Sequence, residues 1–444
     1  MLLRARLPDR PAAAGRSFFC SVEGRRLLTA KEQLKVLTDG VVETIKEEEL
    51  ERKLERSVRE DRPLRVKQGF DPSAPDLHLG HAIGLRKLRQ FQDLGHDVIV
   101  IIGDYTGMIG DPTERAETRP RLTHEQVREN AETYTEQLYK ICDPDHTEVL
   151  FNGDWFAKMS FADVMDLAGR YTIAQILERD DFTNRFQSQQ PISIHELFYP
   201  LMQGYDSVAI KSDIELGATE QKFNCLVGRE LQRAYGIEPQ IVMLLPVLEG
   251  TDGVKRMSKS IGNYIGISEP PKEIYGKTMS IPDTMIARYF ELAVALRGPE
   301  LADVKSRLAE PGINPRDIKR ELARALVALY YDEGQALAAE EEFDRIFAKK
   351  GLPDEVPEPT IEVPASQDGT GGVWVVALIT AAGLAGSNGE ARRLIKQGGF
   401  RLDGEPVGDV DSTVVLDEPR LLQAGKRRFV RILPDNVRYH DRKV

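Results

Sequence analysis

The sequence is poor in cysteine and lacks any long apolar stretch. Its three cysteines, Cys20, Cys142 and Cys225, are odd in number and far apart, so they form no metal-binding pair and suit a reducing compartment. No uninterrupted apolar run of about 18 residues offers a transmembrane helix. No continuous apolar segment follows the basic residues near the start, so a secretory signal is absent as well. We therefore expect no membrane contact and a cytoplasmic location.

The 444 residues are too many for one ordinary core, so two or three domains are expected. Hydrophobic residues make up 41% and charged residues 30%, a globular composition. The net charge of −11 argues against a protein that coats nucleic acid by charge alone. Residues 371–444, however, hold 12 Lys+Arg and 9 Asp+Glu, a net charge of +3, so the rest carries −14. A mildly basic terminal segment is compatible with local contact to RNA.

Residues 1–28 are rich in arginine and poor in acidic residues. An organellar presequence has this composition, but a disordered extension, or a start codon assigned too far upstream, is the favoured interpretation. Ordered structure is expected to begin near Thr29. A charged helix follows at residues 47–60, in which opposite charges lie four residues apart.

A strand–helix–strand pattern comes next. Residues 66–70 predict a short strand and residues 80–94 a helix. Residues 98–102 form an apolar, β-branched run, typical of a strand buried on both faces of a parallel sheet. The alternation continues through strands predicted at residues 147–151 and 241–245. The fold class is therefore α/β, with a doubly wound parallel, Rossmann-like sheet.

Three further segments follow this predicted sheet domain of residues 29–282. Residues 283–350 have the pattern of an all-helical domain. Residues 351–370 contain several prolines among acidic residues and indicate an extended linker. Residues 371–444 are expected to form a small α+β domain, because turn residues alternate there with one short helix and short strands.

Two short segments carry groups suited to phosphate chemistry. His78 and His81 lie at the start of a helix that follows a strand, where side-chain donors and unpaired backbone N–H groups can bind phosphate. Gly80 between them lets a nucleotide approach the backbone. The glycine-flanked run Arg-Met-Ser-Lys-Ser at residues 256–260 can place Lys259 over a triphosphate. Each segment alone is more often structural, but the two together are a rare combination.

The two segments resemble the signature motifs of class I aminoacyl-tRNA synthetases. The wider runs at residues 69–81 and 107–112 are similar to those of tyrosyl-tRNA synthetases in particular. The resemblance extends from about Thr29 to near the C-terminus and points to the bacterial branch with a methionine–serine version of the lysine loop. It implies an enzyme that activates L-tyrosine with ATP and transfers it to the cognate tRNA, with no covalent enzyme intermediate.

Tyr199, Gln203 and Asp206 are spaced i, i+4 and i+7, so they share one face of a helix whose neighbouring residues are apolar. Buried polar groups need partners, so this set suits a pocket. The resemblance implies that Tyr199 and Gln203 bind the amino group of the substrate and that Asp206 accepts its phenol hydrogen. Asp111 matches a further ligand of the ammonium group, and Gln221 another polar wall of the pocket.

Four positions depart from the family pattern. Lys67, in the tyrosine-binding set, stands where many relatives have a tyrosine that also contacts the phenol hydroxyl, and a lysine is compatible with the methionine–serine branch. Ala218 narrows the approach to the ATP ribose, and Glu220 is one methylene longer than the usual ribose-binding aspartate. Arg256 replaces the first lysine of the loop with a planar group. Ala218 and Glu220 predict a shifted ATP pose rather than a loss of activity, and Lys67 puts the second contact to the phenol hydroxyl in doubt.

The resemblance also implies the ATP site and the activation step. The tyrosine carboxylate attacks the α-phosphate of ATP, which Mg²⁺ accompanies, and no structural metal is expected. The residues expected to stabilise the transition state are His78, His81, Lys259, Arg256, Arg115 and Arg119. The predicted ATP-binding residues are Gly69, Asp71, Ser73, Gly80, Ala218, Glu220, Val247, Leu248 and Lys259.

The terminal segment resembles the S-four-type RNA-binding domain, a small module named after a ribosomal small-subunit protein. The stretch of residues on which this resemblance rests begins at Ser387. Ser387 and Glu390 predict a capping box at the start of a basic helix. The predicted RNA-binding residues, through contacts to backbone phosphates, are Arg392, Arg393, Lys396 and Arg401. The family implies that the helical domain contacts the anticodon of the tRNA and that the enzyme is a homodimer through its nucleotide-binding domain.

Three alternatives stay open. A tryptophanyl-tRNA synthetase shares the fold and both motifs, but an indole offers no phenol donor for Asp206, and the terminal domain argues against it too. An RNA-binding or regulatory protein on an inactive synthetase scaffold is disfavoured by His78, His81 and Lys259, although Ala218 and Glu220 keep it open. A plain nucleotidyltransferase would not explain two RNA-binding domains.

Overall fold

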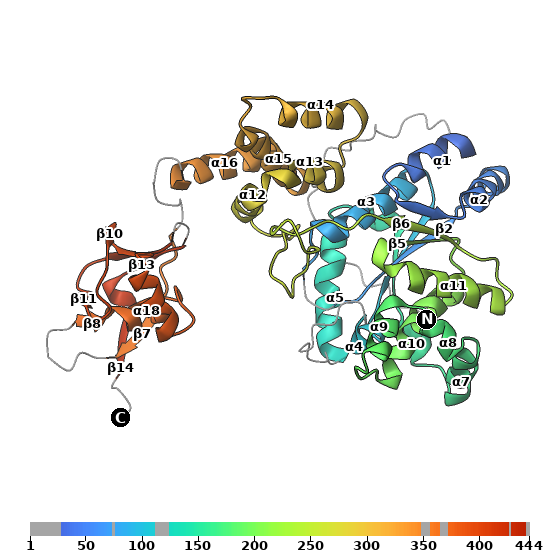
Figure 1. Cartoon of the computed structure of the whole chain (residues 1–444), viewed down its shortest axis with the longest axis horizontal. Helices are drawn as coiled ribbons and strands as arrows, with labels where there is room; N and C mark the ends of the chain where they lie inside the picture. Colours follow the sequence, from blue (N-terminus) through green and yellow to red (C-terminus); the bar gives the residue numbers. More distant parts are fainter. Residues whose placement is uncertain are drawn as a thin grey trace. The chain divides into compact units, whose positions relative to one another are not determined.

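The computed structural model describes residues 28–72, 76–111, 124–347, 356–364, 372–425 and 428–440. The chain divides into two compact units, Met1–Ala336 and Leu337–Val444, and each is described by itself (Figure 1). The predicted extension, apart from Leu28, and most of the predicted linker lie outside the described residues.

A six-stranded sheet forms the centre of the first unit. Its order is β1–β6–β5–β2–β3–β4, and neighbouring strands are parallel except for β1 and β6 at the edge. The strands are β1 (Glu43–Ile45), β2 (Arg65–Phe70), β3 (Asp97–Ile102), β4 (Thr147–Phe151), β5 (Ile214–Ala218) and β6 (Ile241–Leu245). β6 is buried along its whole length, as apolar strands of a covered parallel sheet are. The predicted doubly wound α/β fold is confirmed, with an added antiparallel edge strand.

Helices pack on this sheet and extend beyond it (Figure 1). α3 (Leu79–Asp93) contacts β2, β3 and β5, and α11 (Lys222–Ala234) contacts β5 and β6 as well as α10 (Ile194–Ile210). The remaining helices before and between the strands are α1 (Ala30–Thr38), α2 (Glu47–Glu60), α4 (Thr106–Ile109), α5 (His124–Leu138), α6 (Gly153–Phe156), α7 (Phe161–Gly169), α8 (Ile173–Ile176) and α9 (Asp180–Gln187), with the 3₁₀ turns η2 (Pro144–His146) and η3 (Thr219–Gln221).

The strand order reverses at β2 and β5, which are neighbours in the middle of the sheet. From β2 the chain adds β3 and β4 on one side, whereas β5 and β6 lie on the other. At such a point the connections turn to opposite sides and leave a crevice at the carboxyl ends of the strands. Phe70 ends β2 and Ala218 ends β5, so the segments that follow both strands start at this crevice.

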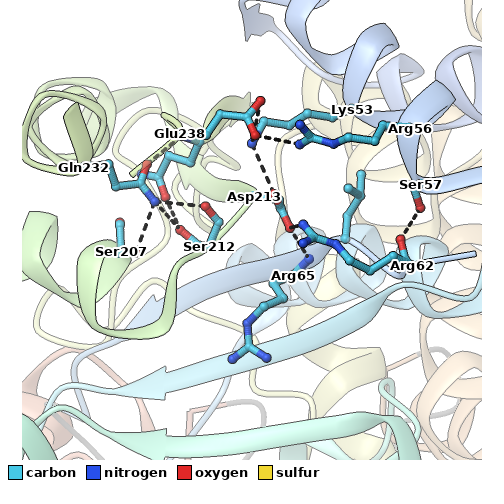
Figure 2. A network of polar contacts seen from close by, with 12 residues as sticks. Lys53, Arg56, Ser57, Arg62, Arg65, Ser207, Ser212, Asp213, Gln232 and Glu238 are labelled. Carbon is cyan, nitrogen blue, oxygen red and sulfur yellow. Dashed lines mark hydrogen bonds and ion pairs between the residues drawn. The ribbon is translucent and has the colours of Figure 1, made fainter. Parts of the chain in front are cut away.

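At the amino ends of the strands, a partly buried ion-pair network fastens α2 to the sheet (Figure 2). Asp213, just before β5, accepts hydrogen bonds from the Arg65 backbone N–H at 3.1 Å and from Lys53 Nζ at 3.2 Å. The Lys53 side chain is only 3% exposed. It also lies 3.9 Å from Glu238, which pairs with Arg56 at 2.6 Å. Because a buried charge needs a partner, Asp213 is what allows Lys53 to be buried here.

Helices dominate from residue 271 to residue 347, earlier than the predicted start at 283. The elements are α12 (Pro271–Ser280), η4 (Asp283–Met285), α13 (Ile286–Tyr289), η5 (Phe290–Val294), α14 (Gly298–Ala309), α15 (Pro315–Tyr330) and α16 (Glu333–Phe347). The N-cap of α15 is Asn314, whose side chain accepts from the Arg316 N–H at 3.1 Å. Its apolar stripe of Ile318, Leu322 and Leu326 is fully buried, and α15 packs on α12.

The second unit has a four-stranded antiparallel sheet, of order β10–β9–β12–β13, and two smaller strand pairs, β11–β8 and β14–β7. Its elements are β7 (Ile361–Pro364), β8 (Gly372–Trp374), α17 (Val375–Ala381), α18 (Asn388–Lys396), β9 (Phe400–Leu402), β10 (Glu405–Pro406), β11 (Thr413–Val415), β12 (Arg420–Ala424), β13 (Arg428–Ile432), η6 (Pro434–Asn436) and β14 (Val437–His440). One apolar core contains residues of α17, α18 and every one of these strands except β10, whose two residues are exposed.

The linker prediction is wrong for β7. This strand pairs in parallel with β14, and its Ile361 and Val363 are 1% and 0% exposed in the apolar core of the second unit. Glu362 between them is exposed. The two-residue alternation of a half-buried strand was therefore present, but the surrounding prolines suggested an extended linker.

The predicted capping box of α18 is only half formed. Ser387 Oγ accepts from the Glu390 backbone N–H at 3.3 Å, as an N-cap should. The Glu390 carboxylate, however, accepts from the Gly386 N–H at 2.8 Å, one residue before the N-cap. The carboxylate thus satisfies a donor of the preceding turn.

Candidate active site

One pocket lies at the carboxyl ends of β2 and β5 and gathers most of the predicted site residues. Those that line it are Gly69, Asp71, His78, Gly80, His81, Asp111, Tyr199, Gln203, Asp206, Ala218, Glu220, Gln221, Val247, Leu248, Arg256 and Lys259. They come from segments almost 200 residues apart in the sequence. Of the other predicted residues, Lys67 lies outside this lining, and Ser73, Arg115 and Arg119 lie outside the described residues.

The two histidines stack at the start of α3, with ring centroids 3.7 Å apart and an interplanar angle of 23°. His78 is the N-cap, and its Nδ1 accepts from the Gly80 N–H at 3.2 Å. His81 Nδ1 accepts from the His78 N–H at 3.2 Å. Because both Nδ1 atoms accept backbone hydrogens, each neutral ring carries its proton on Nε2. The pair therefore offers two Nε2–H donors.

Burial keeps these imidazoles uncharged. Burial, together with the nearby positive charges of Lys259 and Arg256, lowers the pKa of His81 to about 3. For His78, burial again is the main cause, followed by the neighbouring His81, and its pKa lies well below the ordinary value. At neutral pH the pair can therefore bind anionic oxygens as neutral hydrogen-bond donors, which need not gain a proton first.

Gly80 makes room for a histidine. A Cβ at this position would lie 3.0 Å from His78 Cε1 and 3.1 Å from its Nδ1, closer than nearly all real contacts. The sequence analysis assigned this glycine to the approach of a nucleotide. In the structure its missing side chain also lets the His78 ring fold back over the helix start.

The loop at residues 256–260 is built on hydrogen bonds of its own. The Met257 N–H donates to the Leu248 carbonyl at 2.9 Å, and the Ser258 N–H donates to Asn263 Oδ1 at 2.8 Å. Asn263 in turn donates to Asp252 at 2.9 Å. These contacts fix the backbone on either side of Lys259, so the loop presents this lysine to the pocket.

Two partners orient the basic residues of the loop. Lys259 Nζ donates to the Tyr134 hydroxyl at 3.3 Å and lies 5.1 Å from the centre of that ring. Arg256 pairs with Glu220 at 2.8 Å, with side chains 29% and 42% exposed. Two of the departures from the family pattern therefore contact one another. Tyr134, on α5, carried no recognisable signal in the sequence.

Asp206, the predicted acceptor of a phenol hydrogen, is held from the side of β4. Its Oδ1 accepts from Trp155 Nε1 at 3.0 Å, and its Oδ2 accepts from Asn152 Nδ2 at 3.5 Å. Burial raises the pKa of Asp206 to about 7, although Lys67 and the hydrogen bonds from Trp155 and Asn152 act in the opposite direction. The carboxyl group therefore changes its charge near neutral pH.

Tyr199 and Gln203, two other members of the predicted tyrosine pocket, donate hydrogen bonds to carboxylates. Tyr199 donates its hydroxyl hydrogen to Asp71 at 2.9 Å, and Thr106 donates to the other oxygen of Asp71 at 2.8 Å. Gln203 Nε2 donates to Glu215 at 3.1 Å. Thr106 and Glu215 were not predicted, because neither belongs to a recognisable local pattern.

Lys67 does not line the pocket but lies behind it. Its side chain is 1% exposed and pairs with Glu215, itself 2% exposed, at 3.1 Å. Its Nζ also donates to the backbone carbonyl of Gln203 at 3.2 Å. Where many relatives have a tyrosine, this chain therefore has a buried positive charge. That charge lies next to the helix that carries Gln203 and Asp206.

Comparisons with known proteins identify the family of the chain. Residues 59–348 match the family model described as tRNA synthetases class I (W and Y), and residues 373–418 match that of the S4 domain. The tyrosine–tRNA ligase of Moorella thermoacetica is 54% identical over 400 residues, which cover 90% of this chain and 95% of that protein. That of Thermotoga maritima is 52% identical over 405 residues, 91% of this chain and 98% of that protein. The chain belongs to the tyrosine–tRNA ligases of class I.

Solved structures of tyrosyl-tRNA synthetases support the fold. The enzyme from Archaeoglobus fulgidus, complexed with L-tyrosine, has a TM-score of 0.55 and 22% identity, over 70% of this chain and 99% of that one. A truncated mitochondrial enzyme from Coccidioides posadasii has a TM-score of 0.56 and 21% identity, over 70% and 94% of the two chains. The curated relatives at 52–54% identity are bacterial, as the predicted branch of tyrosine–tRNA ligases requires.

The terminal unit carries the predicted basic residues on α18 and β9. Arg392 lies 5.2 Å from the centre of the Trp374 ring. Arg393 and Lys396, on the same helix, are exposed or partly exposed on the side away from the core. Arg401 Nη1 donates to the Gly404 carbonyl at 2.8 Å. Four cations are therefore available near one helix and the following hairpin.

No group of three or more His, Cys, Asp or Glu side chains in the described ranges is placed to hold a metal ion. In the same part of the chain, no helix is both long and apolar enough to cross a membrane.

Proposed function

We propose that the chain activates L-tyrosine with ATP, releasing pyrophosphate, and then transfers the tyrosyl group to the 3′ end of its cognate tRNA. One observation carries this proposal: the histidine pair, the lysine loop and the Tyr199/Gln203/Asp206 set meet in one pocket at the reversal point of the sheet. Nucleotides bind at such points in open α/β sheets. The relatives named tyrosine–tRNA ligase support the same reaction.

In the first step, a carboxylate oxygen of tyrosine attacks the α-phosphorus of ATP, and the bond between that phosphorus and the bridging oxygen of the pyrophosphate breaks. His78 and His81 donate from Nε2 to phosphate oxygens, and Lys259 offsets the charge that develops on the leaving pyrophosphate. Mg²⁺ enters as part of the MgATP substrate. Arg115 and Arg119 are proposed as further cations for this step.

The tyrosine side chain enters the pocket with its phenol toward Asp206. An ionised carboxylate accepts the phenol hydrogen, and phenylalanine would leave this buried group without its donor. The ammonium group of the substrate lies among Tyr199, Gln203 and Asp111, while Gln221 forms a further polar wall. Lys67 supports this pocket from behind.

The ATP ribose and adenine occupy the part of the pocket between β2 and β5. Its proposed contacts are Gly69, Asp71, Ser73, Gly80, Ala218, Glu220, Val247 and Leu248. Asp71 also accepts from Tyr199, so a shift of one would move the other, and the ATP and tyrosine contacts are coupled at this point.

The second step needs tRNA contacts outside the pocket. We assign the anticodon contact to residues 283–350, and phosphate contacts of the terminal unit to Arg392, Arg393, Lys396 and Arg401. The match to the S4 domain supports the second assignment. The catalytic part is assigned to residues 29–282. The terminal domain, first expected at residues 371–444, also takes in β7.

The active form is proposed to be a homodimer in the cytoplasm. Large apolar side chains of four neighbouring helices are 57–78% exposed, and such a surface suits an interface. They are Phe161 and Met165 on α7, Ile173 on α8, Phe186 on α9 and Ile194 on α10. Likeness to bacterial enzymes supports the cytoplasmic location.

Amino-acid-dependent exchange of pyrophosphate into ATP tests the activation step. Tyrosine, phenylalanine and tryptophan are compared, and exchange with tyrosine alone is expected. Exchange with tryptophan instead would mean that the pocket is misread. No exchange with any of the three, in folded protein that binds RNA, would favour the inactive-scaffold alternative.

A further inference from the structure

Arg179 is a buried arginine at the edge of the pocket, and no step described so far uses it. It is the N-cap residue of α9, and its side chain is only 4% exposed. Nη2 donates to Asp111 Oδ1 at 2.7 Å, and Nη1 donates to Asn224 Oδ1 at 3.0 Å. The two ends of one planar guanidinium thus hold two residues from different segments, the stretch just after α4 and the first turn of α11.

The contact to Asn224 reaches a second residue of the amino-acid pocket. Asn224 is 1% exposed, and its Nδ2 donates to Gln203 Oε1 at 2.9 Å. The other end of the Gln203 amide donates to Glu215, which also pairs with Lys67. Since the Glu215 carboxylate accepts here, the amide nitrogen of Gln203 must face it and the oxygen must face Asn224. The orientation of this amide is therefore fixed from both ends.

Local contacts in α9 fix Arg179 itself. Its Nε lies 2.7 Å from Asp181 Oδ1, and its guanidinium carbon lies 5.4 Å from the centre of the Phe182 ring. Phe182 is fully buried. An arginine held on its own helix by a carboxylate and a ring is rigid, and a rigid guanidinium can impose its geometry on Asp111 and Asn224.

We propose that Arg179 is a positioning residue of the amino-acid site, which sets Asp111 directly and Gln203 through Asn224 in the geometry that receives the substrate ammonium. This inference rests on the proposed function. An amide or carboxylate oxygen has two lone pairs, so Asp111 Oδ1 and Gln203 Oε1 can keep their present donors while they bind the ammonium. Arg179 itself does not line the pocket, and it is therefore not assigned a contact to substrate.

The proposal predicts a selective effect on tyrosine. In Arg179→Met, the KM for tyrosine in pyrophosphate exchange is expected to rise by about tenfold or more, the size of a misdirected charge-assisted hydrogen bond. The KM for ATP is expected to stay within about twofold, because no ATP contact depends on this arginine. Arg179→Lys is expected to recover part of the loss, since one ammonium can hold Asp111 but not Asn224 as well.

Arg185→Met is the matched control. Arg185 lies on the same helix and also pairs with a buried carboxylate, Glu196, at 2.6 Å, but neither residue lines the pocket. The control is expected to lower the melting temperature and leave both KM values unchanged. Asn224→Ala, which cuts only the path to Gln203, is expected to raise the KM for tyrosine to a smaller extent, and it serves as the test if Arg179→Met does not fold.

The possible outcomes are distinct. In one outcome, the wild type catalyses exchange with tyrosine while the tyrosine KM is unchanged or lower in both Arg179→Met and Asn224→Ala. That result overturns this inference and leaves the proposed function intact. An equal rise in the Arg185→Met control also overturns it, because the effect would then follow stability. Absence of tyrosine-dependent exchange in the wild type overturns the proposed function and this inference with it. A selective rise at Arg179, with partial rescue by lysine, supports it.

Discussion

Selection of tyrosine by Asp206 is expected to depend on pH. The pKa of this buried carboxyl group lies at about 7. The group is thus about one-tenth protonated at pH 8 and about nine-tenths protonated at pH 6, which is about a tenfold fall in the ionised acceptor. Because the raised pKa belongs to the free protein, the kcat/KM for tyrosine should follow the ionised fraction and rise with pH through this range.

The size of the effect can be checked against hydrogen-bond energies. Protonation exchanges a charged acceptor for a neutral one, which weakens the bond to the phenol by about 1 to 1.5 kcal/mol, or about five- to tenfold in kcat/KM. Phenylalanine gains nothing from an ionised Asp206, so its kcat/KM should not rise with pH. The preference for tyrosine should therefore fall by nearly the same factor between pH 8 and pH 6.

Pyrophosphate exchange at pH 6 to 8, with both amino acids, measures this profile. The histidine pair does not interfere, since the pKa of His81 is about 3 and that of His78 is also well below its ordinary value. Asp206→Asn should flatten the profile. Trp155→Phe removes a donor to the carboxylate and should move the inflection to higher pH. A flat wild-type profile, or the same inflection in Asp206→Asn, would refute the reasoning.

Three further perturbations test other parts of the account. Lys259→Ala should slow exchange by about 100-fold or more, while tyrosine binding, followed by tryptophan fluorescence, stays within about twofold; weakened binding would contradict its phosphate role. Glu220→Gln removes the partner of Arg256 and should raise the KM for ATP by about threefold without changing that for tyrosine, because an exposed pair is worth little. Asp213→Ala leaves the buried Lys53 without its nearest ionic partner and should lower the free energy of unfolding in urea by about 3 kcal/mol. A loss below about 1 kcal/mol would show that Glu238 is a sufficient partner for Lys53.

Local patterns made much of the fold predictable. The predicted helix at residues 47–60 and the predicted strands at residues 147–151 and 241–245 match α2, β4 and β6 residue for residue. Each of these has a periodicity or an apolar run that is complete within the segment. β7 was missed because its alternation spans only four residues beside several prolines.

The pocket residues were predictable only where they belong to motifs. His78, Tyr199 and Lys259 were found in this way, and all three line the pocket. Arg179 and Asn224 were missed, because 45 residues separate them in the sequence and only the tertiary fold brings them together. Residues that position other residues follow no spacing pattern that can be recognised in a single sequence.

Lys67 shows the same limit in a different form. The sequence indicated that it replaces a tyrosine, but not where its long side chain goes. The structure pairs it with Glu215, which lies on the neighbouring strand and carries no motif. A buried cation needs such a partner, and the pairing of β2 with β5 determined which residue supplies it.

The most direct test of the central claim is tyrosylation of tRNA by the full chain. Purified protein is incubated with labelled tyrosine, ATP, Mg²⁺ and bacterial tRNA, and acid-precipitable label is measured, with phenylalanine and tryptophan in parallel. The account predicts that tyrosine alone becomes attached to tRNA and that attachment requires ATP. Attachment of tryptophan in place of tyrosine would contradict this prediction. The absence of any attachment, in protein that also catalyses no pyrophosphate exchange, would contradict it as well.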